Sequence, residues 1–336
     1  MRPVSFELAG LRDRFLFSDA FVVDDAYAGP RLVFVSTYYP DVGFDFAEAL
    51  VTLDGVQLNL FDEIGRDEHE PMRAIVYGLG QLPVRAAHTL EVRFRGQTLS
   101  ARLTPERPSG KTAFALATLF KDDWQTIETC YHHYKQQGVD RFYLFYNGLI
   151  SKLSRPLFSA PEIVYGEWDF RYWLHDPTKK QHHAQAMFLT MARFRLLPQC
   201  TYLALVDLDE FLAVPGEPGV TVREHVENVD AETLTARMYW AEVRRPQSQR
   251  PRAASAPALD LNPADLSHVW ANPRHEGDAR MKTIYRNDFS GLCGVHKPKP
   301  PTDTEVSEAL ALYHLVNTVH GRHNQITPDA TPVSLL

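Results

Sequence analysis

The chain has 336 residues, of which 44% are apolar, 23% charged and 11% aromatic, a composition typical of a soluble globular protein with one or two domains. Its formal net charge of −7 argues against a broad nucleic-acid-binding surface. Three cysteines, far apart in the sequence, argue against a disulfide scaffold or a zinc cluster and favour a reducing compartment. No apolar run approaches the roughly 18 residues of a membrane-spanning helix. We therefore expect a cytoplasmic protein whose contact with a membrane, if it has one, is peripheral.

The first part of the chain, residues 1–108, is predicted to form an all-β domain. Apolar residues alternate with polar ones before and after the turn dipeptide Asp54-Gly55. Asp-Gly between two alternating segments is typical of a β-hairpin, and the segment 90–103 repeats the pattern around a second glycine. These hairpins predict an antiparallel β-sandwich. Because no catalytic residue types cluster in it, we expect a structural or docking role.

The sequence period changes after the polar segment Thr104–Lys111, which predicts a domain boundary near residue 108. Beyond it, apolar runs that suit buried strands alternate with segments that carry an apolar helical face. In chain order, we expect a strand over 113–120, a helix that ends at Gly138, a strand over 141–147, a helix over 182–197 and a strand over 202–206. This alternation predicts that residues 109–336 form an α/β domain with a Rossmann-like, mostly parallel sheet. The Pro/Ala/Ser-rich segment Pro246–Pro263 is predicted to be a mobile loop.

The stretch "LALVDLDEFLAVP", Leu203–Pro215, places three acids between two apolar runs. Functional side chains of α/β domains lie at the carboxyl ends of parallel strands. Asp207 and Asp209 are two residues apart, so on an extended chain their side chains point to the same side. Paired carboxylates at this place suit Mn²⁺ or Mg²⁺, which keep open positions for substrate phosphates. Solvated acids at a strand end are the simpler alternative, but acids flanked by buried runs need a partner.

Three segments of the second domain carry motifs with consistent spacing. The segment 119–148 reads "LFKDDWQTIETCYHHYKQQGVDRFYLFYNG", and the segment 181–212 ends in the D-x-D-E-F motif. Shorter elements, "MKTIYR", "GVHKP" and "YHLVN", follow later in the chain. Together these segments, between about residues 112 and 320, resemble glycosyltransferase family 92 and the family-2-like group with the GT-A fold. The resemblance implies a GT-A-like catalytic domain, and the N-terminal β domain lies outside it.

The resemblance also implies a divalent metal site at these motifs. Asp209 would hold the cation, Mn²⁺ or Mg²⁺, and Asp207 would bind the metal or the ribose of a nucleotide. His296 and His314 fall in the later elements, where a histidine completes the metal shell in many GT-A enzymes. We therefore predict metal ligation by Asp207, Asp209, His296 and His314.

Four further residues are predicted to contact the nucleotide-sugar donor. The sequence departs from the resembling group at two places. Asp122-Asp123 stand in place of Asn-Glu, and no carboxylate follows Asn147 where the group often has one that holds the nucleoside. We therefore expect Asp123 or Asn147 to contact the base or the ribose. Lys282 would neutralise the diphosphate, with a solvated lysine as the simpler alternative. Gln181 begins the second predicted helix, where a contact to donor or acceptor is expected.

The resemblance implies that a sugar is transferred with inversion. Inversion at the sugar carbon needs a carboxylate that deprotonates the acceptor hydroxyl on the opposite face of the sugar. Glu242 follows another strand-like run and is the predicted base, with Glu276 and Asp288 as competitors. Glu210 adjoins the metal motif and is expected to act in the catalytic centre by orienting the donor sugar.

The resemblance thus implies a metal-dependent inverting glycosyltransferase that moves a hexose from a nucleotide diphosphate sugar, most often UDP-linked, to a glycan or glycolipid acceptor. One alternative is a non-transferase D-x-D enzyme, a phosphatase or a nucleotidyltransferase. Phe211 stands where the phosphatase motif requires Thr or Val, which weakens that alternative. A second alternative is an inactive sugar-nucleotide-binding protein on the same scaffold, and the missing carboxylate after Asn147 keeps it open.

Overall fold

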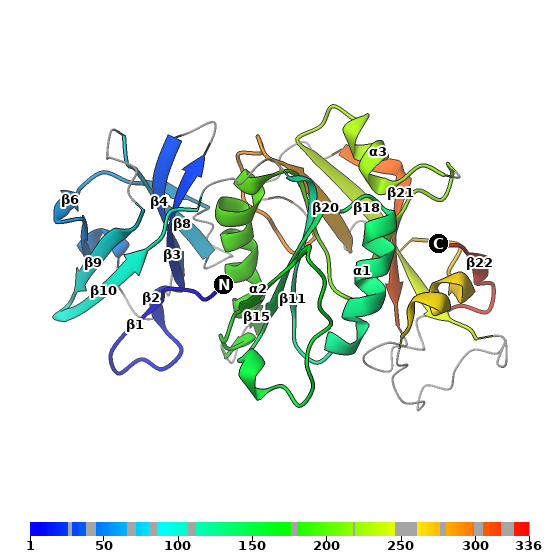
Figure 1. Ribbon diagram of the computed structural model, residues 1–336, viewed down its shortest axis with the longest axis horizontal. Helices are drawn as coiled ribbons and strands as arrows, with labels where there is room; N and C mark the ends of the chain where they lie inside the picture. The colour runs from blue at the N-terminus through cyan, green and yellow to red at the C-terminus, as the bar shows by residue number, and fades with distance from the viewer. Residues whose placement is uncertain are drawn as a thin grey trace.

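The computed structural model describes residues 1–25, 29–37, 45–65, 72–80, 86–106, 112–175, 180–217, 219–245, 261–275, 280–296, 298, 305–316 and 326–335, and the structural statements below concern these residues. Figure 1 shows the N-terminal strands at one end, a large sheet with helices in the middle, and the C-terminal strands at the other end. The predicted domain boundary near residue 108 and most of the predicted loop Pro246–Pro263 lie outside the described residues.

Residues 1–106 form two antiparallel sheets that share one apolar core. The strands are β1 (Phe6–Glu7), β2 (Phe15–Phe17), β3 (Asp19–Asp25), β4 (Gly29–Thr37), β5 (Leu50–Leu53), β6 (Val56–Leu58), β7 (Asp62–Ile64), β8 (Met72–Gly78), β9 (His88–Phe94) and β10 (Gln97–Leu103). The four-stranded sheets have the orders β10-β9-β5-β6 and β3-β4-β8-β7, and β1 pairs with β2. Phe34 and Ile75 of one sheet belong to the same buried cluster as Val51 and Val92 of the other.

The predicted hairpin at Asp54-Gly55 is confirmed. Strands β5 and β6 pair antiparallel, with Leu53 opposite Val56. The turn residues Asp54 and Gly55 have φ angles of 53° and 81°. Positive φ at both positions is typical of the type I′ turn, whose twist matches that of the two strands.

Residues 112–335 are built around one ten-stranded sheet, counted over the described residues. Its strands are β11 (Thr112–Phe120), β12 (Arg141–Tyr146), β13 (Ile163–Glu167), β16 (Cys200–Leu205), β17 (Glu210–Ala213), β18 (Thr233–Val243), β19 (Val269–Ala271), β20 (Met281–Arg286), β21 (Glu305–Leu315) and β22 (Thr331–Val333). The order is β13-β12-β11-β16-β20-β18-β19-β22, with β21 paired to β18 and β17 paired to β21. A small separate hairpin joins β14 (Trp173–His175) and β15 (Lys180–His182).

This sheet is mixed, which corrects the prediction of a mostly parallel sheet. The strands β13, β12, β11 and β16 run parallel to one another. Strand β20 is antiparallel to β16 and β18, and β17, β19 and β22 also pair antiparallel. A parallel pair needs a long crossover, usually a helix. After β16 the described chain has one short α-helix, α3 (Val222–Glu227), and one parallel pair, β18 with β21.

Helices cover the two faces of the parallel half. Along β11, Phe114 and Leu116 join a cluster with α1 (Ile127–Gln136) and α3, while Ala115 and Ala117 join a cluster with α2 (His183–Met191). Successive strand residues point to opposite faces, so α1 and α2 lie on opposite sides of the sheet. Among the helices that the structure describes, none has the length and apolar character needed to span a membrane.

Helix α1 ends at the predicted residue. Gly138 has a φ of 88°, the left-handed conformation that glycine adopts most readily. A Cβ atom at this position would lie 2.6 Å from Cβ of Arg223, at the start of α3. Gly138 is therefore required both by the backbone turn and by the close approach of α3.

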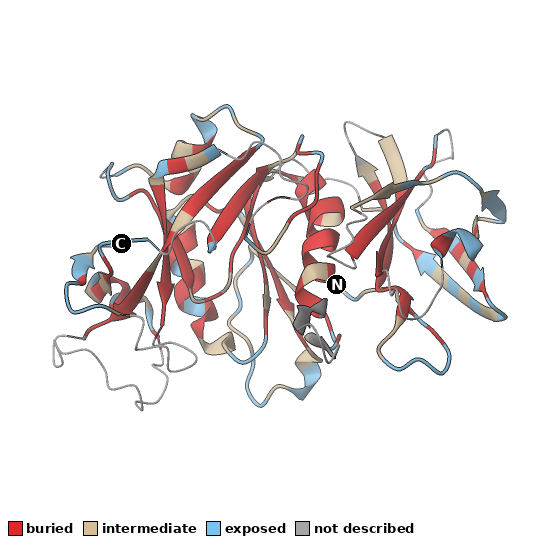
Figure 2. Ribbon diagram, turned by 180° about the vertical axis from the view of Figure 1, so that it is seen from behind, coloured by how far each residue is buried: buried red, intermediate tan, exposed pale blue. Residues whose placement is uncertain are grey.

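Helix α2 is buried on two sides. Its Met187 and Phe188 belong to one cluster with Ala117 of the large sheet and with Val33 and Val76 of the N-terminal sheet. Figure 2 shows α2 almost wholly buried between the two sheets. The helix continues as a π-helical turn, Ala192–Leu196, and a 3-10 turn that contains Pro198. The predicted helix 182–197 therefore exists, with an irregular last part that is first π-helical and then 3-10.

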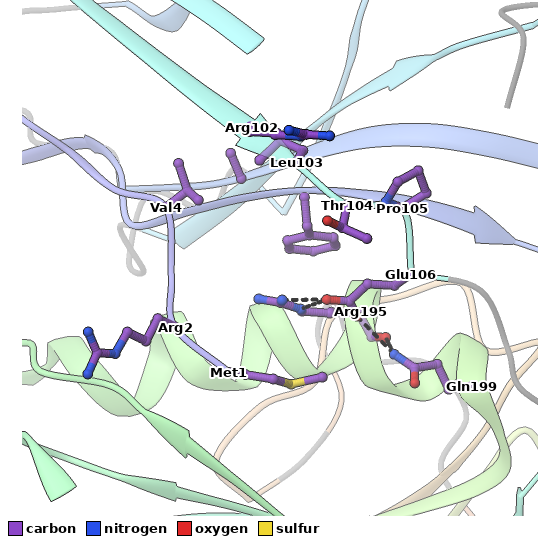
Figure 3. A pocket seen from close by; sticks show the side chains of 12 residues that line it. Met1, Arg2, Val4, Arg102, Leu103, Thr104, Pro105, Glu106, Arg195 and Gln199 are labelled. Carbon is purple, nitrogen blue, oxygen red and sulfur yellow. Dashed lines mark hydrogen bonds and ion pairs between the residues drawn. The ribbon is translucent and has the colours of Figure 1, made fainter. Parts of the chain in front are cut away.

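A buried ion cluster stabilises the contact between the irregular end of this helix and the N-terminal strands. Arg195 Nη1 lies 2.8 Å from Asp19 Oδ2, and Arg195 Nε lies 2.6 Å from Glu106 Oε1. Gln199 Nε2 donates to Glu106 Oε2 at 3.0 Å. Figure 3 shows Arg195, Glu106 and Gln199 lining a cavity of about 450 Å³ between the N-terminal strands and the end of the helix. Burial raises the pKa of Asp19 to about 6 although the Arg195 charge lowers it.

Candidate active site

The three acids lie where the parallel strand β16 ends. Asp207 and Asp209 follow β16 directly, and Glu210 is the first residue of β17. Leu203 and Ala204, before them, are fully buried in the middle of the sheet. The acids are thus carried on a rigid strand to the edge at which the parallel strands end, as the sequence predicted.

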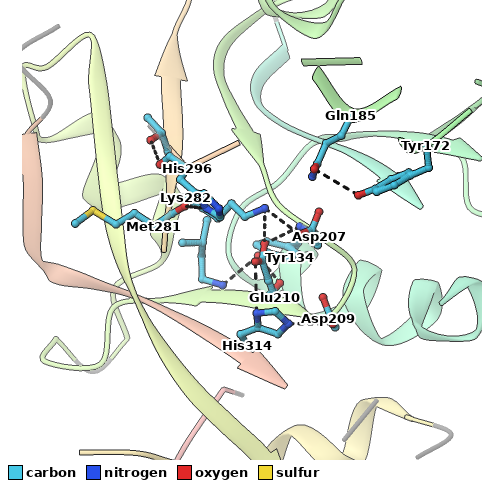
Figure 4. A network of polar contacts seen from close by, with 12 residues as sticks. Tyr134, Tyr172, Gln185, Asp207, Asp209, Glu210, Met281, Lys282, His296 and His314 are labelled. Atoms are coloured by element: carbon cyan, nitrogen blue, oxygen red, sulfur yellow. Dashed lines mark hydrogen bonds and ion pairs between the residues drawn. The ribbon is translucent and has the colours of Figure 1, made fainter. Parts of the chain in front are cut away.

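Lys282 bridges two of the acids. It lies on β20, the neighbour of β16, and its Nζ is 2.9 Å from Asp207 Oδ2 and 3.1 Å from Glu210 Oε2. Figure 4 shows the three side chains converging. Burial lowers the pKa of the Lys282 ammonium, but the two carboxylates raise it by more, so the group stays charged. Lys282 therefore supplies a fixed positive charge beside the acids.

His314 pairs with the third acid. It lies opposite Glu210 in the β17–β21 pairing. Its Nε2 is 3.2 Å from Asp209 Oδ2, and its Nδ1 is 3.7 Å from Glu210 Oε1. Burial opposes ionisation of both partners, yet their attraction lowers the pKa of Asp209 and raises the pKa of His314. Among the described residues, buried His314 Nδ1 has no hydrogen-bond partner.

Glu210 is held in place from both ends. Its Oε2 accepts a hydrogen bond from the backbone N of Asp207 at 2.8 Å, which closes the turn between β16 and β17. The hydroxyl of buried Tyr134, on α1, donates to the carbonyl of Glu210 at 2.9 Å and accepts from the backbone N of Leu212 at 3.0 Å. Burial raises the pKa of Glu210. The geometry of this carboxylate is therefore set before any ligand arrives.

Asp123, which follows β11, lies at the same edge. Its Oδ1 accepts from the backbone N of Lys121 at 3.1 Å. Burial, together with the negative charge of Asp209, raises the pKa of Asp123 to about 7. Asp123, which is predicted to contact the nucleotide-sugar donor, thus lies close enough to Asp209 for the charge of that carboxylate to raise its pKa.

Asn147 and Gln181 are placed differently from one another. Asn147 is buried, and its Nδ2 donates to the carbonyls of Trp168 and Phe170 at 2.7 and 2.8 Å. Its amide nitrogen therefore holds the loop after β13. Gln181 lies in β15, and its side chain is outside the described residues.

Sequence reasoning missed Gln185, in the first turn of α2. Gln185 is buried on α2 and lines a small cavity together with Asp207 and Lys282. Its Oε1 accepts from the Tyr172 hydroxyl at 3.4 Å, as Figure 4 shows. Gln185 lies in the helix that the apolar spacing predicted, but its position beside Asp207 depends on how α2 packs against the sheet.

His296 is not brought against the acids. Its Nδ1 lies 3.3 Å from the carbonyl of Met281. Burial and the nearby charge of Lys282 lower its pKa. With Lys282 between it and Asp207, His296 does not join Asp209 and His314 in a ligand set. The predicted ligand pair Asp209 and His314 is adjacent, whereas the predicted ligands Asp207 and His296 face Lys282 and a backbone carbonyl.

The placement of Glu242 argues against its predicted role as the base. Its side chain is fully buried in β18, and Arg244 Nε lies 2.6 Å from its Oε1. The Arg244 guanidinium also lies over the Trp270 ring, 4.5 Å from its centroid. A base must reach an acceptor hydroxyl, and an internal ion pair does not. Of the competitors, Asp288 pairs with Arg286 at 2.8 Å on the surface, and Glu276 lies outside the described residues.

The donor atoms at this edge suit a divalent cation only in part. Asp209 and His314 bring a carboxylate oxygen and an imidazole nitrogen within 3.2 Å of each other, and both groups are common metal ligands. In the part of the chain that the structure describes, no group of three or more His, Cys, Asp or Glu side chains is arranged to hold a metal ion. The protein thus offers two adjacent ligands, and phosphate oxygens of a substrate commonly complete such a site.

A comparison with known families gives one match. Residues 111–321 match the model of the family described as Glycosyltransferase family 92. The match covers more than half of the 336 residues and contains the whole acid cluster with Lys282 and His314. Strands β1 to β10 lie outside it. No curated protein matches the chain. The family-92 part of the resemblance seen in the sequence is thereby confirmed.

Proposed function

Because the chain belongs to glycosyltransferase family 92 and is a glycosyltransferase, we propose that it transfers a hexose with inversion from a nucleotide diphosphate sugar, UDP-linked, to a glycan or glycolipid acceptor. The observation that carries the proposal is the convergence of three acids, Lys282 and His314 at the edge where the parallel strands end. Ligands of α/β sheets bind at that edge, and a departing diphosphate needs positive charge there.

We propose a GT-A-like arrangement for residues 109–336, preceded by a β-sandwich in residues 1–108. The strand order β13-β12-β11-β16 supports the first, because the acids follow the strand that lies beside β11 on the inner side of the sheet. The shared core of the two N-terminal sheets supports the second.

Asp209 and His314 are the residues we propose to hold a divalent cation, Mn²⁺ or Mg²⁺, with Asp207 turning toward it from Lys282. The bound cation would stabilise the negative charge that develops on the leaving diphosphate. Lys282 is fixed and charged beside the same place, so it stabilises that charge without having to reorganise. Glu210, held by Tyr134 and Asp207, orients the donor sugar.

Asp123 is the residue we propose as the base. It is half-buried, lies near Asp209, and forms no ion pair among the described residues. A carboxylate whose pKa is raised toward 7 accepts a proton more readily than an ordinary one near neutral pH. Asp123 Oδ2 would take the acceptor's hydroxyl proton as the hydroxyl oxygen bonds to the sugar carbon and the diphosphate leaves.

The test is nucleotide diphosphate release from a panel of UDP-, GDP- and dTDP-sugars with Mn²⁺. We expect slow release from a UDP-sugar in the wild type and none in Asp209→Ala. The matched control is Asp288→Ala, which removes an exposed acid near the opposite end of β16 and should leave release unchanged. Release of phosphate from simple esters would instead indicate a phosphatase. Failure to bind any nucleotide in calorimetry, with and without Mn²⁺, would contradict the proposal and favour an inactive scaffold.

A further inference from the structure

The large sheet has a second polar hollow on the face opposite the acids. Along β18, Trp240 points toward His314, with ring centroids 4.8 Å apart. Its neighbour Tyr239 therefore points to the other face, where it meets Tyr313 of β21, the neighbour of His314. The strands β18 and β21 thus serve the acid cluster with one face and this hollow with the other.

The hollow has a volume of about 160 Å³ and spans four neighbouring strands. Two of these strands, β21 and β22, lie near the C-terminus in Figure 1. Its walls come from β18, β19, β21 and β22. The lining residues used below are Arg237, Tyr239, Asn272, Ser307, Glu308 and Tyr313. No residue of the acid cluster takes part, so the hollow is separate from the proposed catalytic centre.

The floor of the hollow is aromatic. The rings of Tyr239 and Tyr313 lie 5.8 Å apart at an angle of 34°. Tyr313 is buried, and burial raises its pKa to about 12, whereas Tyr239 is partly exposed. Tyrosine presents a rigid apolar face with a polar tip and loses little conformational freedom on binding. The floor therefore suits a flat ligand with an apolar face.

The rim of the hollow presents fixed hydrogen-bonding groups. Arg237 Nη1 lies 2.7 Å from Glu308 Oε2, and 78% of the Glu308 side chain is exposed. Ser307 and Asn272 lie deeper and are buried. Among the described residues, Arg237 Nε is buried without a hydrogen-bond partner, so the guanidinium is not saturated by the protein. A guanidinium and a carboxylate side by side offer donors and acceptors to neighbouring hydroxyl groups.

We propose that this hollow binds one pyranose ring of a neutral oligosaccharide. A pyranose ring has an apolar face of C–H groups, which would lie on Tyr239, and a rim of hydroxyls, which would meet Arg237 and Glu308. Pockets with an apolar floor and a few convergent polar groups are typical of small-ligand sites. The paired opposite charges leave no net charge that would select an anionic ligand. This binding does not depend on the proposed transfer reaction.

The test measures binding of maltotetraose, cellotetraose and a β-1,4-linked N-acetylglucosamine tetramer to the full-length protein by saturation-transfer NMR and calorimetry. We expect at least one of them to bind, and its methine protons to receive saturation from the protein. Tyr239→Ala should weaken that binding about tenfold, the order expected for loss of one aromatic contact. Tyr239→Phe should retain it, which separates stacking from a folding defect.

Two matched variants on β21 test the rim. Glu308→Gln should weaken the binding, whereas Glu305→Gln, an exposed acid on the same strand outside the hollow, should not. Asp209→Ala should leave oligosaccharide binding intact, and Tyr239→Ala should leave nucleotide diphosphate release intact. Binding that is lost in Asp209→Ala but kept in Tyr239→Ala would place the oligosaccharide in the catalytic centre and overturn the proposal. Absence of binding by all three tetrasaccharides would overturn it too, whatever the release assay shows.

Discussion

Two buried clusters of this protein have the same plan, a cation between two carboxylates, and differ in their surroundings. In each, a basic side chain bridges two acids, namely Arg195 between Asp19 and Glu106, and Lys282 between Asp207 and Glu210. We refer to them as the Arg195 cluster and the Lys282 cluster. The first lies beneath the N-terminal sheet, and the second lies at the sheet edge where the parallel strands end.

Both carboxylates of the Arg195 cluster have hydrogen-bond partners besides Arg195. Asp19 also accepts hydrogen bonds from the backbone N of Val4 and Ala20, both at 2.9 Å, and Gln199 satisfies Glu106. The Lys282 cluster has two further acids beside it, Asp209 and Asp123, and of the described residues only His314 pairs with one of them. Surplus negative charge in a buried place is unstable without a partner. This difference indicates that the Arg195 cluster, whose carboxylates are paired, stabilises the contact between two parts of the fold. The Lys282 cluster keeps surplus negative charge, which a ligand can balance.

Replacing each bridging cation with methionine should separate the two roles most strongly. Lys282→Met and Arg195→Met should each destabilise the protein by about 3–5 kcal/mol, because each leaves buried carboxylates without a cation. Nucleotide diphosphate release should fall at least about 100-fold in Lys282→Met, whereas folded Arg195→Met should release at the wild-type rate. Urea unfolding followed by circular dichroism and a release assay at low temperature measure the two effects. Equal loss of release in both variants would show that the clusters do not differ in function.

The contribution of the Arg195 cluster to stability should also depend on pH in a distinct way. The folded protein holds the Asp19 proton up to a pKa of about 6, whereas the unfolded chain releases it near 3.8. The folded state therefore binds more protons in between, and this group lowers the stability as pH rises from about 4 to 6, by about 3 kcal/mol in total. The contribution is constant above pH 6.

The measurement is the free energy of unfolding at pH 4, 5, 6 and 7 in the wild type and in Asp19→Asn. The difference between the two proteins should change across pH 4 to 6 and stay flat from 6 to 7. A difference that does not change with pH would mean that Arg195 keeps Asp19 ionised throughout.

A third cation–carboxylate pair, Arg244 with Glu242, should resemble the Arg195 cluster because it contributes to stability and not to activity. Glu242→Gln should reduce the free energy of unfolding by about 2 kcal/mol, since the buried guanidinium keeps a hydrogen-bond acceptor but loses its counter-charge. Nucleotide diphosphate transfer by the folded variant should be unchanged. A variant of full stability that transfers no sugar would restore Glu242 as the base, and Asp123→Asn provides the comparison.

The smallest effect is expected from Tyr134→Phe. The variant removes the hydroxyl that bridges the backbone of Glu210 and Leu212, and should destabilise the protein by about 1 kcal/mol. If the hydroxyl also fixes the acid turn, KM for the donor should rise while kcat changes less. Phe142→Leu, which alters the same core without touching the turn, is the control. An unchanged KM would show that Lys282 and the backbone N of Asp207 position Glu210 without the hydroxyl.

The elements that sequence reasoning predicted well are those with a local signal. The Asp54-Gly55 hairpin, the end of α1 at Gly138 and the buried strand before Asp207 each follow from turn chemistry or from an apolar run. The mixed sheet did not follow, because the direction of β20 depends on how the chain returns to β16, which local periodicity does not encode. The burial of α2 on both sides likewise depends on a sheet more than 100 residues earlier in the chain.

The site was predictable as far as residue types and motifs reach. Asp207, Asp209 and Glu210 were identified by their spacing, and Lys282 and His314 by the resemblance to a family. Which acid each base contacts depends on strand pairing, since His314 faces Glu210 only through the β17–β21 register. The pairing of Glu242 with Arg244 was not predictable, because a strand-like run with an acid looks the same whether the acid is exposed or buried.

Helix α2 has one further consequence. Because its side chains fill the space between two sheets, neither sheet can separate from α2 without exposing its own apolar face and that of the helix. The N-terminal strands and the family-92 region are therefore thermodynamically coupled through a shared hydrophobic layer. Mutations of Val33 or Val76, which lie in the N-terminal sheet, should be transmitted to the stability of the strands that carry the acids, and the two halves should melt in a single cooperative transition.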